Sequence, residues 1–160
     1  MDIDPKLDLV LERILDVPRE LVWKSWTTPS HLKHWFTPRP WETPHCEIDL
    51  KPGGIFRTIM KSPEGQEIDN SGCCLQVIEN EILCWTDCLL PGFRPKKDGF
   101  MTVKLILEDA NEVKSSTRYK AIVFHSDEEA KIHHENMGFE QGWGTVVEQL
   151  EAYIKNQMMR

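Results

Sequence analysis

Tight-turn signals divide the middle of the chain, residues 41–124, into short runs in which polar and apolar residues alternate. No other feature constrains the fold as strongly. At 51–54 the sequence is Lys-Pro-Gly-Gly, in which proline presets one φ angle and glycine accepts a positive one. Further turn signals lie at 62–65, 79–81 and 109–111. Turns this short join antiparallel neighbours, so the pattern predicts a meander of antiparallel strands.

One of the expected strands has an unusually polar interior face. After a first strand at 7–15, the clearest runs are 55–61, 74–78, 82–89, 100–107 and 113–124. In the last run, one face carries Val113, Ser115, Thr117, Tyr119, Ala121 and Val123. The opposite face is largely charged and must meet solvent. The inward hydroxyl groups indicate either a space that holds water or a ligand, or a hydrogen-bonded network in a packed core.

Helical patterns flank the meander on both sides. Apolar residues at helical spacing follow Pro18 and recur at 32–36, which predicts two short helices after the first strand. Asp127 can cap a long helix that runs toward the C-terminus. A long helix over one face of a curved antiparallel sheet of about six to seven strands makes the fold class α+β, with two layers.

The C-terminal helix carries three glycines at its front. Its apolar stripe consists of Trp143, Val146, Val147, Leu150 and Ile154. Gly138, Gly142 and Gly144 lie around the start of this stripe. Each glycine inside a helix costs roughly 1 kcal/mol relative to alanine. Three interpretations remain open: a helix break near Gly138, close packing on a strand or on the 28–36 helix, and cavity volume beside Trp143.

Composition and charge disfavour several classes of protein. The formal net charge is −7 and Lys and Arg form no cluster, which argues against nucleic acid or an anionic membrane as a partner. The chain has no run of about 18 apolar residues, and its acidic N-terminus has no apolar signal core. We therefore expect a single cytoplasmic domain over residues 1–160, monomeric or homodimeric, with reduced cysteines and no structural zinc.

The histidines are the obvious candidates for catalysis or metal binding, but they form no recognisable motif. His31 and His34 have a spacing that suits two metal ligands, although a solvated helix face explains them better. His133 and His134 would point about 100° apart on a helix, which is unfavourable for sharing a metal. His125, at the end of the last strand, could act as a general base or cap the turn. We expect no metal, no cofactor and no catalytic residue.

Three stretches make the chain similar to a known family. They are RILDVPRELVWKSWTTPSHLKHWF (13–36), EIDLKPGGIFRTIMKSPEGQE (47–67) and HHENMGFEQGWGTVVEQLEAYI (133–154). With them the chain resembles the START-related, polyketide-cyclase-like superfamily called SRPBCC, which has the helix-grip fold. Within it, the chain looks like the branch named for the activator of the heat-shock-protein-90 ATPase. The resemblance implies a cavity between the C-terminal helix and the concave face of the sheet, with the two short helices at its mouth.

Aromatic residues are the main candidates for the lining of this implied cavity, because aromatic walls with a few hydroxyl groups are typical of apolar small-molecule sites. Plain core packing is the better explanation for any one of these residues when it is taken singly. The candidate set is Trp35, Phe36, Trp41, Phe56, Trp85, Met101, Tyr119, Gly138, Gly142 and Trp143.

Because the fold hosts many activities, three functional hypotheses follow. The first is a protein that binds a small hydrophobic ligand. The second is an interaction domain that modulates a chaperone ATPase in a stress response. The eukaryotic activators carry a further N-terminal domain that is not expected before residue 7 here, which weighs against this hypothesis. The third is an enzyme of the cyclase or dehydratase type, for which no acid–base pair stands out.

Overall fold

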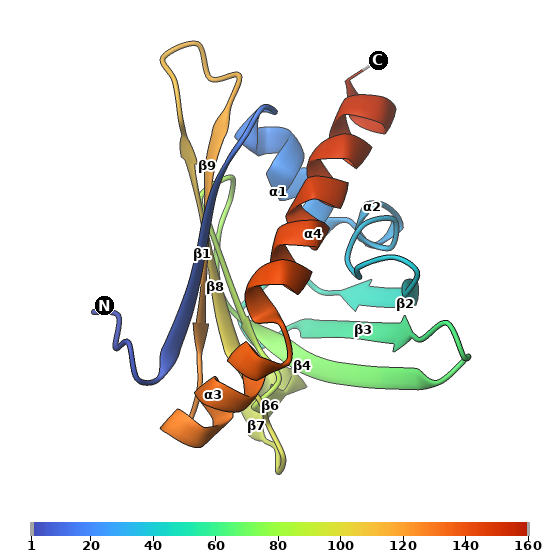
Figure 1. Cartoon of the computed structure of the whole chain (residues 1–160), viewed down its shortest axis with the longest axis vertical. Coiled ribbons are helices and arrows are strands. Elements are labelled where there is room, and N and C mark those ends of the chain that lie inside the picture. Colours follow the sequence, from blue (N-terminus) through green and yellow to red (C-terminus); the bar gives the residue numbers. More distant parts are fainter. Residues whose placement is uncertain (1, 160) are drawn as a thin grey trace.

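A seven-stranded antiparallel sheet forms the frame of the protein in the computed structural model, which describes residues 2–159 (Figure 1). The strand order is β1-β9-β8-β5-β4-β3-β2. The strands are β1 (Asp8–Leu15), β2 (Glu42–Ile48), β3 (Ile55–Lys61), β4 (Glu67–Ile78), β5 (Ile82–Thr86), β8 (Thr102–Asp109) and β9 (Thr117–Phe124). A second, two-stranded sheet pairs β6 (Leu89–Leu90) with β7 (Arg94–Pro95).

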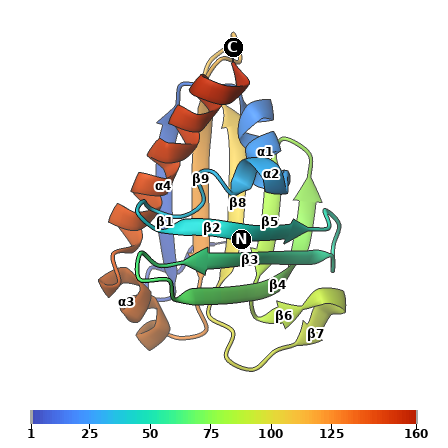
Figure 2. The same cartoon turned by 90° about the vertical axis from the view of Figure 1, so that its right-hand side faces the viewer.

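The helices lie on one side of the curved sheet. They are α1 (Arg19–Thr27), α2 (Pro29–Leu32), α3 (Glu128–Asn136) and α4 (Phe139–Tyr153), with a 3-10 turn at Pro91–Phe93 and a π-helical turn at Ile154–Met158. Figures 1 and 2 show α4 running diagonally across the sheet, with α1 and α2 beside it and β2–β4 almost perpendicular to β1, β9 and β8. The expected α+β helix-grip architecture is therefore confirmed. No helix within residues 2–159 is long and apolar enough to cross a membrane.

The strand pattern was predicted well in the centre of the sheet and less well at strand ends. β4 is longer than the expected 74–78 because its polar first half, 67–73, still pairs with β3. The run at 82–89 stops at Thr86, since the Asp87 carboxylate accepts the backbone N–H groups of Phe100 and Met101 at 2.7 and 2.9 Å. The second short helix ends at Leu32, earlier than the pattern at 32–36 indicated.

The last strand begins four residues later than expected. Residues 111–115 form a loop, which Asn111 closes by accepting the Ser115 N–H at 3.0 Å. Val113, expected to face inward, is 78% exposed. The inward hydroxyl groups that remain have partners: Thr117 donates to the Val17 carbonyl at 2.7 Å, and Tyr119 accepts a hydrogen bond from Trp143. Of the two interpretations of this polar face, the structure supports the hydrogen-bonded network in a packed core.

The C-terminal helical region is broken at Gly138. Asp127 caps α3 as expected, because its side chain accepts the Ala130 N–H at 2.8 Å. Gly138 then adopts a left-handed conformation, with φ 91° and ψ 38°, and α4 starts at the next residue. The glycine thus lets the chain change direction between two helices, which was the first of the three interpretations of these glycines.

We expect Gly138→Ala to lower the free energy of unfolding by about 1–2 kcal/mol, because a Cβ is disfavoured in the left-handed region. Steric overlap contributes little, since the added Cβ would meet only the Gln141 side-chain oxygen, at 3.9 Å. Urea denaturation would measure the change. Gly142→Ala is the matched control: Gly142 lies within α4 and its added Cβ touches nothing, so alanine should stabilise by up to about 1 kcal/mol. Equal stability of the two variants would contradict this account of the break.

Candidate functional site

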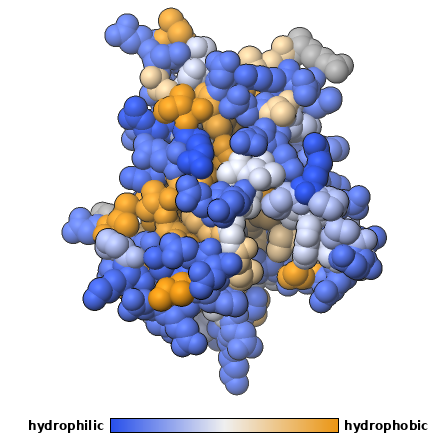
Figure 3. Space-filling model, viewed as in Figure 1, coloured by the Kyte–Doolittle hydropathy of each residue, from blue (hydrophilic) through white to orange (hydrophobic). Residues whose placement is uncertain are grey.

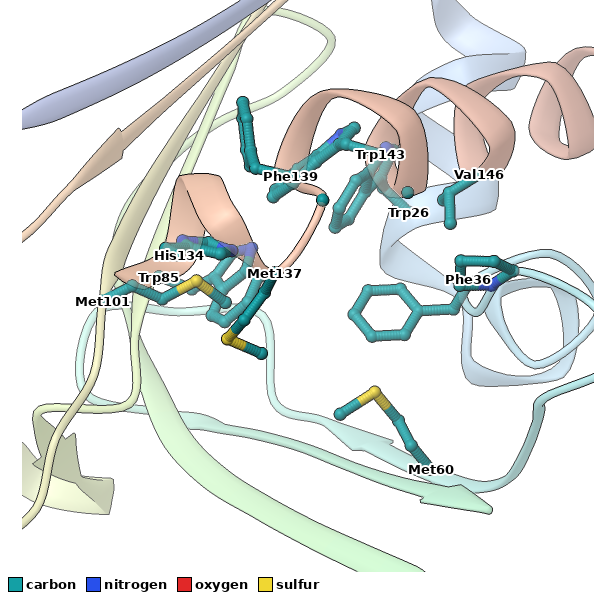
Figure 4. Close-up of a pocket in the computed structure, with 13 residues that line it drawn as sticks. Trp26, Phe36, Met60, Trp85, Met101, His134, Met137, Phe139, Trp143 and Val146 are labelled. Atoms are coloured by element: carbon teal, nitrogen blue, oxygen red, sulfur yellow. The ribbon is translucent and has the colours of Figure 1, made fainter. Parts of the chain in front are cut away.

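An apolar pocket of about 320 Å³ opens between the start of α4 and the concave face of the sheet (Figure 4). Its lining comes from helices at both ends of the chain, from the loop after α2, from β3 and β5, and from Met101 directly before β8. The lining residues are Trp26, Phe36, Pro38, Met60, Trp85, Met101, His134, Met137, Gly138, Phe139, Gly142, Trp143 and Val146. Met137 is 66% exposed and lies at the rim, whereas Trp26 is 1% exposed and forms a deep wall.

Gly142 gives the pocket part of its space. A Cβ built at this position would have no heavy atom within 4 Å. Close packing therefore does not explain Gly142, which borders the pocket beside Trp143. Gly144 differs, because a Cβ there would lie 3.6 Å from the Arg13 guanidinium at the surface side of the helix. The absence of a side chain at Gly142 leaves the backbone of α4 accessible to a molecule in the pocket.

Aromatic rings form the rigid wall of the pocket. Trp26 and Trp143 are stacked with 6.5 Å between ring centroids, and Phe139 lies 5.6 Å from Trp143. Phe36 meets the edge of Trp26 at 5.8 Å. Figure 4 shows Phe36 and Met60 on one side of the space and His134 and Met137 on the other, so each side combines an aromatic ring with a flexible thioether. Such a combination adapts to apolar ligands of different shape.

Tyr119 positions the Trp143 ring from the side of the ring that faces away from the pocket. The indole N–H of Trp143 donates to the Tyr119 hydroxyl at 3.0 Å. Tyr119 is fully buried on β9, and burial raises the pKa of its hydroxyl far above the usual value, so the group stays protonated. The hydrogen bond fixes the orientation of Trp143 and leaves the apolar part of the indole to the pocket.

We expect Tyr119→Phe to lower the free energy of unfolding by about 1–3 kcal/mol, because the Trp143 N–H would lose its acceptor inside the protein. Guanidinium denaturation followed by circular dichroism would measure the loss. Tyr153→Phe is the matched control, since its hydroxyl bonds to His31 at 2.6 Å in a partly exposed position. If Tyr119→Phe loses no more free energy of unfolding than Tyr153→Phe does, the buried hydrogen bond to Trp143 does not stabilise the pocket wall.

The candidate residues taken from the sequence divide into two groups. Those on the pocket are Phe36, Trp85, Met101, Gly138, Gly142 and Trp143. The remaining four are placed elsewhere: Trp35 is buried against Trp26, Phe56 stacks under Trp85 at 4.5 Å, Tyr119 lies behind Trp143, and Trp41 borders a separate surface hollow with Pro40. Trp35, Phe56 and Tyr119 therefore pack behind the residues that line the pocket. Trp41 lies outside the pocket altogether.

Several lining residues were not among the candidates. Trp26 belongs to the apolar residues at helical spacing that follow Pro18, but it was not among the candidates for the cavity lining. Phe139 could have been found, because it precedes Trp143 by one helical turn and so shares its face. Met60, Met137 and Val146 carry no distinctive signal, and His134 was considered only as a metal ligand.

His125 and His134 form a contact that the sequence pattern did not predict. His125 is buried directly after β9, and its Nε2 lies 2.9 Å from Nδ1 of His134. Burial, together with the charge of His125, lowers the pKa of His134 to about 4. His31 and His34 both contact Tyr153. Within residues 2–159, no three His, Cys, Asp or Glu side chains are grouped closely enough to hold a metal ion.

Fold and pocket together define a helix-grip protein, in which a long helix and a curved antiparallel sheet enclose an apolar space. The family described as Activator of Hsp90 ATPase homolog 1-like protein matches residues 16–155, so the chain belongs to this family. No curated protein matches the chain.

Solved structures of bacterial proteins are similar to this chain. A crystal structure of a Nitrosomonas europaea protein is 43% identical with a TM-score of 0.94, and the match covers 99% of this chain and 100% of that one. A Rhodobacter sphaeroides protein, 17% identical, has a TM-score of 0.81 with 97% of both chains covered. The AHSA1 protein of Silicibacter pomeroyi, 22% identical, has a TM-score of 0.67 over 94% of this chain and 99% of its own. The last two show likeness of fold alone.

Proposed function

We propose that this protein binds a small, mainly apolar molecule in the pocket between α4 and the sheet. The observation that carries the proposal is the pocket itself: about 320 Å³ lined almost entirely by aromatic, thioether and aliphatic groups, with glycine where a helix side chain would otherwise fill it. Single exposed apolar residues are normal, but a concave apolar site with rigid walls is typical of ligand binding.

The size of the pocket favours a compact ligand. Ligand sites occupy roughly 300–1,000 Å³, so this one is at the small end of the range. Molecules with one or two rings, or a short acyl chain, fit this volume better than a sterol does. The polarizable sulfurs of Met60, Met101 and Met137 suit aromatic ligands in particular.

Binding without catalysis agrees with the chemistry of the lining. His134 is the titratable side chain of the pocket, and its pKa of about 4 makes it a weak base at neutral pH. A general base works best when its pKa lies near the working pH. We therefore rank a cyclase- or dehydratase-like reaction below ligand binding. All five cysteines are free, which suits the cytoplasmic location that we propose for the protein.

Tryptophan fluorescence tests the proposal directly, because Trp26, Trp85 and Trp143 line the pocket and a bound molecule would change their environment. Titration with fatty acids, sterols and aromatic polyketides should give saturable quenching for compact members of the panel. Each binder should also raise the melting temperature, since a ligand that binds only the folded state stabilises it. Absence of both effects across the panel would contradict ligand binding.

A second candidate function comes from the family name, which describes activation of the Hsp90 ATPase. Strand β1 is an edge of the sheet and exposes Val10 at 40% and Ile14 at 58%, which supports a protein contact outside the pocket. Apolar residues are visible on the β1 side of an otherwise mainly hydrophilic face (Figure 3). Measuring ATP hydrolysis by a purified Hsp90 with and without this protein tests whether it modulates a chaperone ATPase. Loss of any stimulation in Ile14→Asp, with the fold intact, would support it, and an unchanged ATPase rate would refute it.

A further inference from the structure

We infer that the His125–His134 pair makes the pocket select apolar molecules that carry a hydrogen-bond donor, such as a phenol or an alcohol. This inference rests on the proposed function, because it names the ligand class of the same site. The protons of the pair can be placed one after the other from the Leu7 carbonyl to the pocket, because each hydrogen bond fixes the tautomer of the next ring.

The first step is the contact between His125 and the chain before β1. Nδ1 of His125 lies 2.8 Å from the carbonyl oxygen of Leu7. A carbonyl oxygen only accepts hydrogen bonds, so Nδ1 must carry the proton and donate it. In neutral His125 the other ring nitrogen, Nε2, then has a free lone pair and can only accept.

The second step transfers this constraint to His134. Nε2 of His125 lies 2.9 Å from Nδ1 of His134. Because Nε2 accepts, Nδ1 of His134 must carry the proton. The neutral His134 ring therefore has its lone pair on Nε2, for which residues 2–159 provide no hydrogen-bond donor. His134 lines the pocket, and we infer that this unpaired nitrogen is the atom that a ligand meets there.

The surroundings of His134 keep it neutral. Its ring packs on Phe100 at 4.9 Å and on Phe139 at 5.2 Å between centroids. Burial, His125 and His133 all lower its pKa, and together they outweigh the Asp87 carboxylate, which raises it. At neutral pH the ring therefore offers a lone pair rather than a positive charge to the pocket.

The rest of the lining makes this acceptor the group that distinguishes one ligand from another. Of the side chains that line the pocket, His134 alone has a nitrogen or oxygen lone pair, because Trp is a donor and Phe, Met, Pro and Val offer none. The Trp143 N–H is already bonded to Tyr119. The N–H groups of Trp26 and Trp85 have no hydrogen-bond partner among residues 2–159, but both nitrogens are buried in the wall and are not exposed at its surface. A ligand hydroxyl can donate to His134, whereas an ether leaves the acceptor unpaired and a carboxylate places a negative charge against a lone pair in an apolar site.

The experiment compares β-naphthol with its methyl ether and with β-naphthoate, which share one ring system. Dissociation constants would be measured by tryptophan quenching at about pH 8, where histidine is ordinarily neutral. We expect the wild type to bind β-naphthol roughly tenfold more tightly than the ether, and the acid most weakly. In His134→Phe the preference for naphthol over ether should disappear. His133→Gln is the matched control. His133 is the neighbour of His134 on α3, but it is exposed and does not line the pocket, so the preference for naphthol should persist in this variant.

Heteronuclear NMR of the imidazole nitrogens gives an independent measurement on the protein without ligand. Both His125 and His134 should carry their proton on Nδ1. If His134 carries it on Nε2, the inference is wrong even if the pocket binds naphthalenes.

Equal affinity for naphthol and its ether, or the same preference in His134→Phe, would also overturn the inference while leaving the proposed function intact. If none of the three compounds binds although a compound of the earlier panel does, the inference is wrong and the proposed function stands; if nothing binds, both fail. His134→Leu serves as a second variant should His134→Phe not fold.

Discussion

Replacing Trp26 by alanine should lower the free energy of unfolding by about 3–5 kcal/mol, the range for removing a large aromatic side chain from a core. Trp26 is 1% exposed on α1 and is the centre of the aromatic cluster. Its ring contacts Trp35 at 5.0 Å and Phe36 at 5.8 Å and stacks on Trp143. The substitution therefore removes the element that connects α1, the loop after α2 and α4. Chemical denaturation monitored by circular dichroism would measure the change.

Trp41→Ala is the matched control for Trp26. Trp41 is partly exposed, borders a separate hollow and takes no part in the aromatic cluster. Its loss should cost about 1 kcal/mol, which is usual for a partly exposed site. Similar losses for the two variants would mean that the cluster around Trp26 does not hold the helices on the sheet.

Replacing Gly142 by leucine should weaken ligand binding at least tenfold while leaving the melting temperature close to that of the wild type. The position faces open space in the pocket, so a leucine side chain occupies the volume that a ligand would use. Leucine is also a better helix former than glycine by several tenths of a kcal/mol or more, which offsets part of any strain. Tryptophan quenching and a thermal melt on the same sample separate the two effects.

Gly142→Ala provides the control, because a single Cβ meets no atom and takes little of the space. Alanine should leave binding nearly unchanged and make the protein slightly more stable. Wild-type affinity in Gly142→Leu would show that ligands bind elsewhere. A large fall in its melting temperature would instead favour the interpretation of close packing around α4.

Much of the fold could be predicted because its signals are local. Turns with Pro and Gly marked the meander, and Gly138 marked a change of direction that an ordinary side chain would resist. Strand ends were less predictable, since they depend on distant partners. The Asp87 carboxylate ends β5 by binding the backbone near residue 100, and β4 extends through a polar stretch because β3 lies beside it. Neither effect is visible in a run of neighbouring residues.

The sequence predicted the kinds of residue that line the pocket better than it predicted which particular residues do so. Aromatic residues at helical spacing identified Phe36 and Trp143, but depth in the fold decides whether a ring lines the space or supports it. Trp85 on β5 lines the pocket while Phe56 on β3 stacks against it from beneath, although both strands belong to the same sheet. The His125–His134 pair depends on the angle at which α3 leaves β9, and the sequence gives no spacing rule for that angle.

Native mass spectrometry of the freshly purified protein tests the central claim most directly, because it detects any small molecule that remains in the pocket. The account predicts an adduct of a compact apolar compound that is absent from the denatured mass and from Gly142→Leu, and retained by Gly142→Ala. A bare mass for the wild type, with no compound of the panel binding on addition, would contradict it. So would an adduct that Gly142→Leu retains at wild-type occupancy.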